Sequence, residues 1–184
     1  KQLQGNQLEL LPELQSSLRV GLKRSFSGLL WKTLQEQYEE IGFSRLEDDA
    51  FKALCLARIV EPTSKIDSLR VLVDLGVEPI DQNKLYRSLA KAATMDYRKM
   101  ISQACFEYIG KGGLALVLYD VTTLYFEVQE EDEYRKPGMS KERRLEPQII
   151  LGLLVDQNGF PLGIQRFEGN KAETKTILPV IQDF

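Results

Sequence analysis

The chain has 184 residues, with 24 Lys and Arg against 27 Asp and Glu, two Cys and no His. Without His there is no Ser-His-Asp or Cys-His nucleophile system, no His-ligated zinc and no imidazole acid or base. A length of this order suits one full domain or two small ones, and 43% hydrophobic with 28% charged residues is typical of a globular protein. Any chemistry must therefore depend on carboxylates, hydroxyls, Lys, Arg or Tyr.

The two cysteines and the N-terminal segment exclude further classes. Cys55 and Cys105 lie far apart in apolar, helical contexts and form no C-x-x-C pair, which favours buried reduced thiols. The N-terminus lacks the basic and then apolar pattern of a signal peptide, and the longest apolar runs are too short to cross a bilayer. We therefore expect a soluble cytoplasmic protein without a membrane partner. Since Lys1 is not Met, we expect a processed chain or a piece of a longer protein.

The first half of the chain is helical in pattern. Apolar residues recur at helical spacing from Trp31 to Ile41, and Gly42 is placed as a stop. A third helix is expected to end at Gly76 and the last at Gly110. The side chains placed to cap the four later helices are Asp48 or Asp49, Ser64, Asp81 and Thr94.

The helix that begins after Asp81 carries a basic stripe. Lys84, Arg87 and Lys91 follow one another at i, i+3 and i+7, so they share one side of the helix. Together with the preceding helix this gives a helix-turn-helix-like pair, and contact with DNA is one interpretation of the stripe. The other interpretation is that the stripe is simply the hydrated side of an amphipathic helix.

The pattern changes to strands after residues 110–113. Residues 114–119 form a continuous apolar run, which predicts a strand buried on both faces. Residues 149–155 and 161–167 predict two more strands joined by a hairpin turn, and residues 172–184 predict a helix that Pro179 would kink or restart. Such an apolar sheet needs helices on both faces, and too few residues remain to supply them. We therefore predict an α+β or α/β fold with a helical region at 1–110 and an incomplete β-β-β-α region at 111–184.

Asp120 follows the first apolar run directly. A carboxylate at the end of a buried strand is costly to desolvate unless a cation or a donor meets it, and a divalent metal suits its oxygens. Alternatively, Asp120 caps the strand end or bonds Thr122 and Thr123 in a local turn. Asp156 is interpreted as a turn residue roughly 20 Å away. Glu168 ends the third strand and is a weaker candidate ligand.

The densest basic segment, residues 135–144, lies between the first two strands. Its cations include Lys141, Arg143 and Arg144. A basic loop beside a carboxylate that holds a metal suits a phosphodiester substrate, since phosphates need both a cation and hydrogen-bond donors. Alternatively, the loop only balances the acidic run at residues 130–133.

Several of these segments together resemble one family. Residues 119–127, 138–144, 147–155 and 167–170 occur in an order and spacing similar to bacterial insertion-sequence transposases of the DDE type, whose catalytic core is RNase H-like. Residues 56–65 and 85–89 are similar to the helical N-terminal region of that family. The resemblance therefore covers the chain from about residue 50 to its end.

The resemblance implies a reaction and part of a site. Asp120 matches the first acid of the family's triad, while the second Asp and the Glu would lie beyond Phe184. Lys141 and Arg144 match basic positions that contact the phosphates of double-stranded DNA at the element ends, and Glu142 stands where the family usually has Asp. The family's reaction is phosphoryl transfer with two Mg²⁺ held by three carboxylates, in the bacterial cytoplasm at the nucleoid.

Three hypotheses follow from the sequence. The first is an N-terminal part of a transposase, inactive as this chain. The second is a DNA-binding or regulatory truncated transposase without catalysis, and the third is a complete small metal-dependent nuclease that uses Asp120 with Glu168. An incomplete core also suggests a homo-oligomer in which the exposed sheet edge pairs with a second copy.

Overall fold

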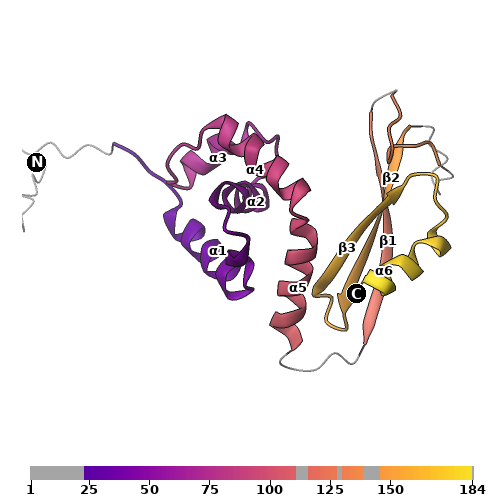
Figure 1. The fold of residues 1–184 in the computed structure, drawn as a ribbon. Coiled ribbons are helices and arrows are strands. Elements are labelled where there is room, and N and C mark those ends of the chain that lie inside the picture. The colour runs from indigo at the N-terminus through magenta and orange to yellow at the C-terminus, as the bar shows by residue number, and fades with distance from the viewer. Residues whose placement is uncertain (1–22, 111–115, 128–129, 139–145, 184) are drawn as a thin grey trace, which may run out of the picture.

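The computed structural model describes residues 23–110, 116–127, 130–138 and 146–183. The fold is α+β, with a helical half joined through α5 to a three-stranded antiparallel sheet (Figure 1). None of the helices in the described ranges is both long and apolar enough to cross a membrane. The α-helices are α1 (Gly28–Glu40), α2 (Asp49–Val60), α3 (Ser68–Asp74), α4 (Gln82–Thr94), α5 (Tyr97–Ile109) and α6 (Ile177–Asp183). The short 3₁₀ helices are η1 (Phe43–Leu46) and η3 (Glu173–Lys175), and the strands are β1 (Val117–Tyr125), β2 (Gln148–Asp156) and β3 (Pro161–Glu168).

The ends of the early helices follow the sequence pattern. The Asp48 and Asp81 carboxylates accept backbone N–H bonds at the starts of α2 and α4, which confirms both as N-caps. Gly42 and Gly76 follow α1 and α3 with φ of 89° and 82°, a conformation that glycine adopts without strain.

Thr94 was expected to start the last helix, and this prediction is wrong. Thr94 is the final residue of α4, and its hydroxyl donates to the carbonyls of Ala90 at 3.2 Å and Lys91 at 3.0 Å. A threonine hydroxyl can bond back to the preceding turn as readily as it caps the next helix, so its presence alone does not distinguish the two. α5 instead begins after Asp96, which has φ of 48°.

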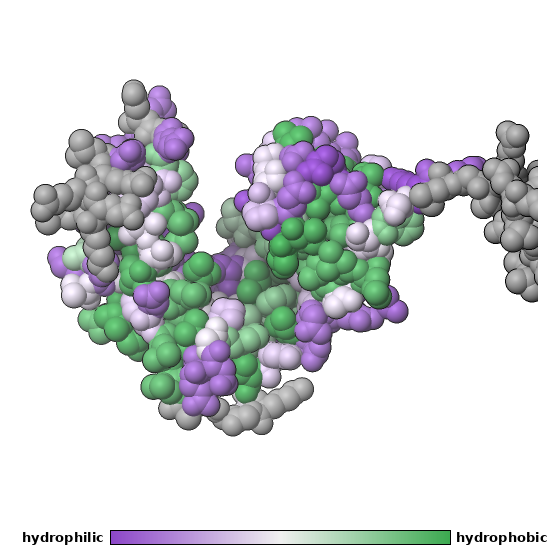
Figure 2. Space-filling view, turned by 180° about the vertical axis from the view of Figure 1, so that it is seen from behind, coloured by the Kyte–Doolittle hydropathy of each residue, from purple (hydrophilic) through white to green (hydrophobic). Residues whose placement is uncertain are grey.

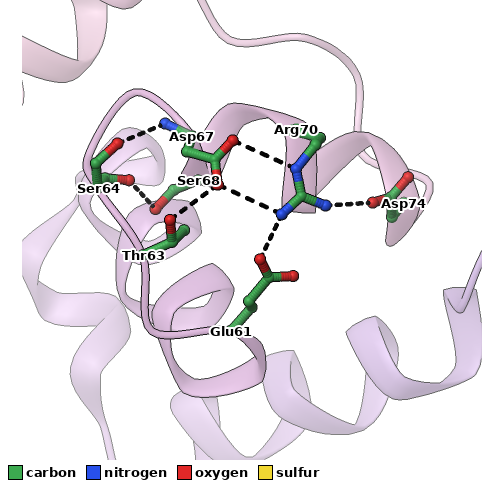
Figure 3. A network of polar contacts seen from close by, with 7 residues as sticks. All are labelled: Glu61, Thr63, Ser64, Asp67, Ser68, Arg70 and Asp74. Carbon is green, nitrogen blue, oxygen red and sulfur yellow. Dashed lines mark hydrogen bonds and ion pairs between the residues drawn. The ribbon is translucent and has the colours of Figure 1, made fainter.

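Arg70 joins the end of α2 to α3 (Figure 3). Its guanidinium bonds the carboxylates of Glu61, of Asp67 at 3.3 Å and of Asp74 at 3.2 Å. This pairing lowers the pKa of the Asp67 carboxyl below its ordinary value. The N-cap residue of α3 is Asp67 rather than the expected Ser64, whose hydroxyl instead accepts the Asp67 backbone N–H at 3.0 Å in the preceding turn. The polar network therefore fixes the corner at residues 61–68.

The Asp48 carboxylate connects three helices. It accepts the Phe51 backbone N–H at 3.0 Å on its own helix, the Ser88 hydroxyl of α4 at 2.9 Å and the Tyr97 hydroxyl of α5 at 2.9 Å. Partial burial raises the pKa of Asp48, but these hydrogen bonds together lower it by more, so the net pKa lies below the ordinary value. The ionised carboxylate thus holds the start of α2 against α4 and α5.

Helix α5 packs on both halves of the molecule. Tyr97 and Met100 belong to the helical core, while Ile109 packs against the core of the sheet. Along β3, Arg98 donates to Gln165, and near the hairpin Tyr108 stacks on Phe160 with ring centroids 5.5 Å apart. The helix therefore lies along β3 from the hairpin at Phe160 as far as Gln165 (Figure 1).

The sheet has one covered face and one open face. The strand order is β1-β2-β3, and the buried side chains on the face toward α5 and α6 are Ile150, Leu154, Leu162 and Phe167, packed with Val180 of α6. On the other face, which no described element covers, Leu118, Leu124, Leu153 and Ile164 are 36% to 48% exposed. Hydrophobic side chains reach the surface of both halves in Figure 2.

The expectation that the first strand is buried on both faces is therefore wrong. β1 alternates between half-buried and exposed residues along its whole length. The strand lies further along the chain than the apolar run and includes the polar residues Asp120, Thr122 and Thr123, so it is the burial of its residues that alternates regularly. Such alternation is typical of a strand with a single covered face. Within the described ranges, the outer edge of β1 pairs with no other strand.

The final helix docks on the covered face. The Tyr119 hydroxyl donates to Thr176 Oγ1 at 2.7 Å, just before α6. Pro179 lies in the first turn of α6 and neither kinks nor restarts it, because backbone N–H groups there have no partner within the helix.

We predict that Asp48→Ala lowers the free energy of unfolding by about 2 kcal/mol at neutral pH, because it removes a cap and leaves the Ser88 and Tyr97 hydroxyls without their acceptor. Since the folded pKa of Asp48 is lowered, this stabilisation is present above the ordinary value of 3.8 and is lost as the pH falls through the folded pKa. Urea unfolding at several pH values measures the difference, which should shrink in acid.

The matched control is Asp49→Ala. The neighbouring Asp49 side chain is 85% exposed and, among the described residues, forms an ion pair with Lys52 alone, at 3.4 Å. Its removal should cost less than about 0.5 kcal/mol. Equal losses for the two variants would contradict the role given to Asp48.

Candidate functional site

Asp120 lies in the middle of β1, on the open face of the sheet. It stands opposite Leu153, and Leu118 and Thr122 flank it on the same face. Its expected place at a strand end, with a local turn at Thr122 and Thr123, is therefore wrong, because both threonines continue the strand. The Asp120 carboxylate is exposed. No described residue donates a hydrogen bond to it or forms an ion pair with it.

The other two acids of the sheet lie far from Asp120. Glu168 is opposite Ile149 on the same face, but two strands across and four residues along, which is about 16 Å by strand geometry. Asp156 lies on the opposite face, about 11 Å away rather than the expected 20 Å, because Asp120 is not at the strand end. Its carboxylate accepts the N–H groups of Asn158 at 2.8 Å and Phe160 at 2.7 Å, which confirms Asp156 as a turn residue.

These positions do not fit a site for two Mg²⁺. Two ions need several oxygen ligands within one coordination shell, whereas Glu168, the other sheet carboxylate on the face of Asp120, lies about 16 Å away by strand geometry. The described ranges contain no group of three or more Cys, Asp or Glu side chains that could hold a metal ion. The described residues of this chain therefore supply at most one ligand to such a site.

The predicted DNA-contacting residues fall in two places. Lys141, Arg143 and Arg144 lie at residues 139–145, outside the described residues. Lys84, Arg87 and Lys91 project from α4 and line one shallow hollow.

That hollow on α4 also contains acids. Glu47, Asp48 and Asp49 line its other side, so carboxylates match the cations of the stripe in number. Lys91 also lies over the Tyr97 ring, 5.9 Å from its centroid. The stripe is therefore a mixed surface, whose attraction for phosphate is weakened by the facing carboxylates.

Beyond the end of β3 the chain crosses itself closely. Lys136 pairs with Gln148 through two backbone hydrogen bonds of 3.1 Å. It therefore pairs with β2 directly beyond the last β2–β3 pair, Ile149 with Glu168. Gly169 lies under this crossing: a Cβ on it would be 2.0 Å from the Gln148 carbonyl oxygen and 2.3 Å from that of Lys136. Its N–H donates to the Tyr134 carbonyl at 3.0 Å. Only glycine fits this contact.

A second hollow, which the sequence reasoning missed, opens beside this crossing. We call it the basic hollow; it measures about 440 Å³. Its lining includes the cations Arg166, Lys171 and Lys175, the single carboxylate Glu168, and the side chains of Tyr134 and Asn170. In the sequence, the cations on both sides of Gly169-Asn170 were the available signal for this hollow. The presence of Tyr134 in its lining could not be predicted, because it depends on the pairing of Lys136 with Gln148.

No protein-family model, curated protein or solved structure matches this chain.

We predict that Gly169→Ala lowers the free energy of unfolding by about 3 kcal/mol, because backbone atoms on two segments must move apart to admit the methyl group. Gly110→Ala is the matched control, since a Cβ there meets nothing within 4 Å, and it should change stability by less than about 1 kcal/mol. Urea unfolding of both variants makes the comparison. A Gly169→Ala protein as stable as the control would refute the close crossing.

Proposed function

We propose that the chain is the N-terminal part of a DDE-type transposase, in which Asp120 is the first of three metal-binding acids. The observation that carries the proposal is the series of four ordered motifs, together with the position of Asp120 on the first of three consecutive antiparallel strands. The order β1-β2-β3-α6 is compatible with the opening of an RNase H-like core. The proposed activity of the whole protein is cleavage and joining of DNA strands at element ends.

The other two hypotheses differ in their support. A small nuclease that pairs Asp120 with Glu168 is disfavoured, because strand geometry separates them by about 16 Å. A regulatory protein that binds DNA without catalysis is the second candidate. It is favoured by the basic hollow, whose lining has three cations and one carboxylate and needs no catalytic acid to bind an anion.

The gene beyond the codon for Phe184 tests the proposal directly. We expect the reading frame to continue into a fourth strand followed by Asp, and then to a helix that carries Glu. The purified full-length product, incubated with element-end DNA and Mg²⁺, should lose cleavage by at least about a thousandfold on Asp120→Asn, since a metal ligand is removed. Gel analysis of end-labelled DNA measures this loss.

Asp156→Asn is the matched control in that assay. An asparagine oxygen can accept the same turn hydrogen bonds, so cleavage should stay within about threefold of the parent protein. A stop codon directly after Phe184 would instead favour the regulatory candidate. Equal effects of the two substitutions would contradict the role proposed for Asp120.

The isolated 184-residue chain should not nick transposon-end DNA with either Mg²⁺ or Mn²⁺, because Asp120 has no neighbouring carboxylates among the described residues. Calorimetry should likewise find no tight Mg²⁺ binding. Robust nicking by this chain that disappears on Asp120→Asn would overturn the expectation and favour the small nuclease.

A further inference from the structure

The basic hollow combines unpaired cations with little opposing charge. Arg166, Lys171 and Lys175 line it against the single carboxylate of Glu168. Within the described ranges, none of the three cations forms an ion pair with any Asp or Glu. By contrast, Arg70 in the helical half is shared among three carboxylates. A surface with unmatched positive charge attracts anions, even in a chain whose net charge is −3.

Aromatic rings hold two of these cations in place. The Arg166 guanidinium lies over the Tyr134 ring, 4.1 Å from its centroid, and the Lys171 ammonium lies 4.8 Å from the centroid of Phe167. A guanidinium stacked by one face keeps its N–H edge available for oxygen acceptors, and the contact lowers the entropy lost on binding. Arg166 is therefore positioned before any ligand arrives.

The backbone crossing positions Tyr134 itself. The Tyr134 carbonyl accepts the Gly169 N–H at 3.0 Å, and the next pairing, between Lys136 and Gln148, fixes the same segment against β2. Buried Gln148 adds a bond from its side-chain amide to the Gly169 carbonyl at 2.7 Å. The turn at residues 169–171 and the segment at 134–136 thus form one rigid support for the cations.

We propose that the basic hollow binds the phosphodiester backbone of a DNA strand. This inference rests on the proposed function, which makes DNA the substrate, and it adds a contact surface outside the basic segment at residues 139–145. The hollow is open, and Arg166, Asn170 and Lys175 are exposed, so it suits an extended polyanion rather than an enclosed small molecule. The planar guanidinium can bond two phosphate oxygens, while the lysines add charge and Asn170 a further donor.

The test measures fluorescence anisotropy of a labelled DNA strand and of its duplex, with the 184-residue chain, at several NaCl concentrations. The combined variant Arg166→Ala, Lys171→Ala and Lys175→Ala should weaken binding at least about tenfold at low salt. For the duplex, it should also lower the slope of log Kd against log salt concentration by about 2 to 3, since each lost phosphate contact removes about 0.9 from that slope.

The matched control is Lys23→Ala, Lys32→Ala and Lys65→Ala, which makes the same change in net charge at exposed positions of the helical half. It should leave the slope unchanged. The triple substitution in the hollow also removes two ring contacts, which could destabilise the fold. The single variant Lys175→Glu changes an exposed residue without a ring contact, and Lys65→Glu is its matched control. Melting temperatures of all variants report whether they fold.

Three results would overturn the assignment: no DNA binding by the parent chain at low salt, equal weakening by the hollow and control variants, or competition by poly-glutamate as effective as DNA of equal charge. The last result would show a general polyanion surface. If these binding tests fail while cleavage by the full-length protein still depends on Asp120, only the DNA-binding role of the basic hollow is refuted. If the hollow binds DNA but the gene does not encode the two later acids, the transposase proposal is wrong and the DNA-binding role of the basic hollow stands.

Discussion

The covered face of the sheet depends on α5, which belongs to both cores of the molecule. A three-stranded sheet must bury one apolar face to be stable, and α6 alone is too short to cover it. α5 supplies the missing surface along β3 while its first turn stays inside the helical core through Tyr97. Its position is in turn fixed by the Asp48 carboxylate, which bonds Tyr97. A polar contact in the helical half therefore contributes to the packing of the sheet.

Two groups of cations on the molecule differ in what surrounds them. In the helical half, Arg70 is paired with acids and the α4 stripe faces Glu47, Asp48 and Asp49. In the sheet half, the cations around Gly169 are held by aromatic rings rather than by carboxylates. Ion pairing satisfies a cation locally, whereas a ring contact leaves its N–H groups available to a ligand. The basic hollow is thus a better candidate than the α4 stripe for binding a polyanion.

Local chemistry accounts for what the sequence could predict. Asp48 and Asp81 were recognisable as caps because a short acceptor precedes an apolar helical pattern, and the β2-β3 hairpin was recognisable from its turn residues. Thr94 was misplaced because its hydroxyl has two local uses. The place of Asp120 was misjudged because the apolar run before it was taken to be the whole strand.

Long-range geometry accounts for what was missed. The stacking of Arg166 on Tyr134 joins residues far apart in the sequence, and it exists only because Lys136 pairs beside β2 beyond the end of β3. No local pattern around Tyr134 indicates that pairing. Both the shared face of Glu168 and Asp120 and the distance between them likewise depend on the register across two strands.

The outer edge of β1, which no strand of the described ranges pairs with, limits how Asp120 can acquire neighbours. Residues directly opposite each other on paired antiparallel strands have Cβ atoms about 4.5 to 5.5 Å apart, and only alternate residues share a face. A strand that pairs with this edge, from any source, would bring one residue into direct contact range of the Asp120 side chain, and the register would decide which one. A slip of one residue would deliver that side chain to the helix-covered face instead. The chemistry available to Asp120 is therefore a question of strand register at a single edge.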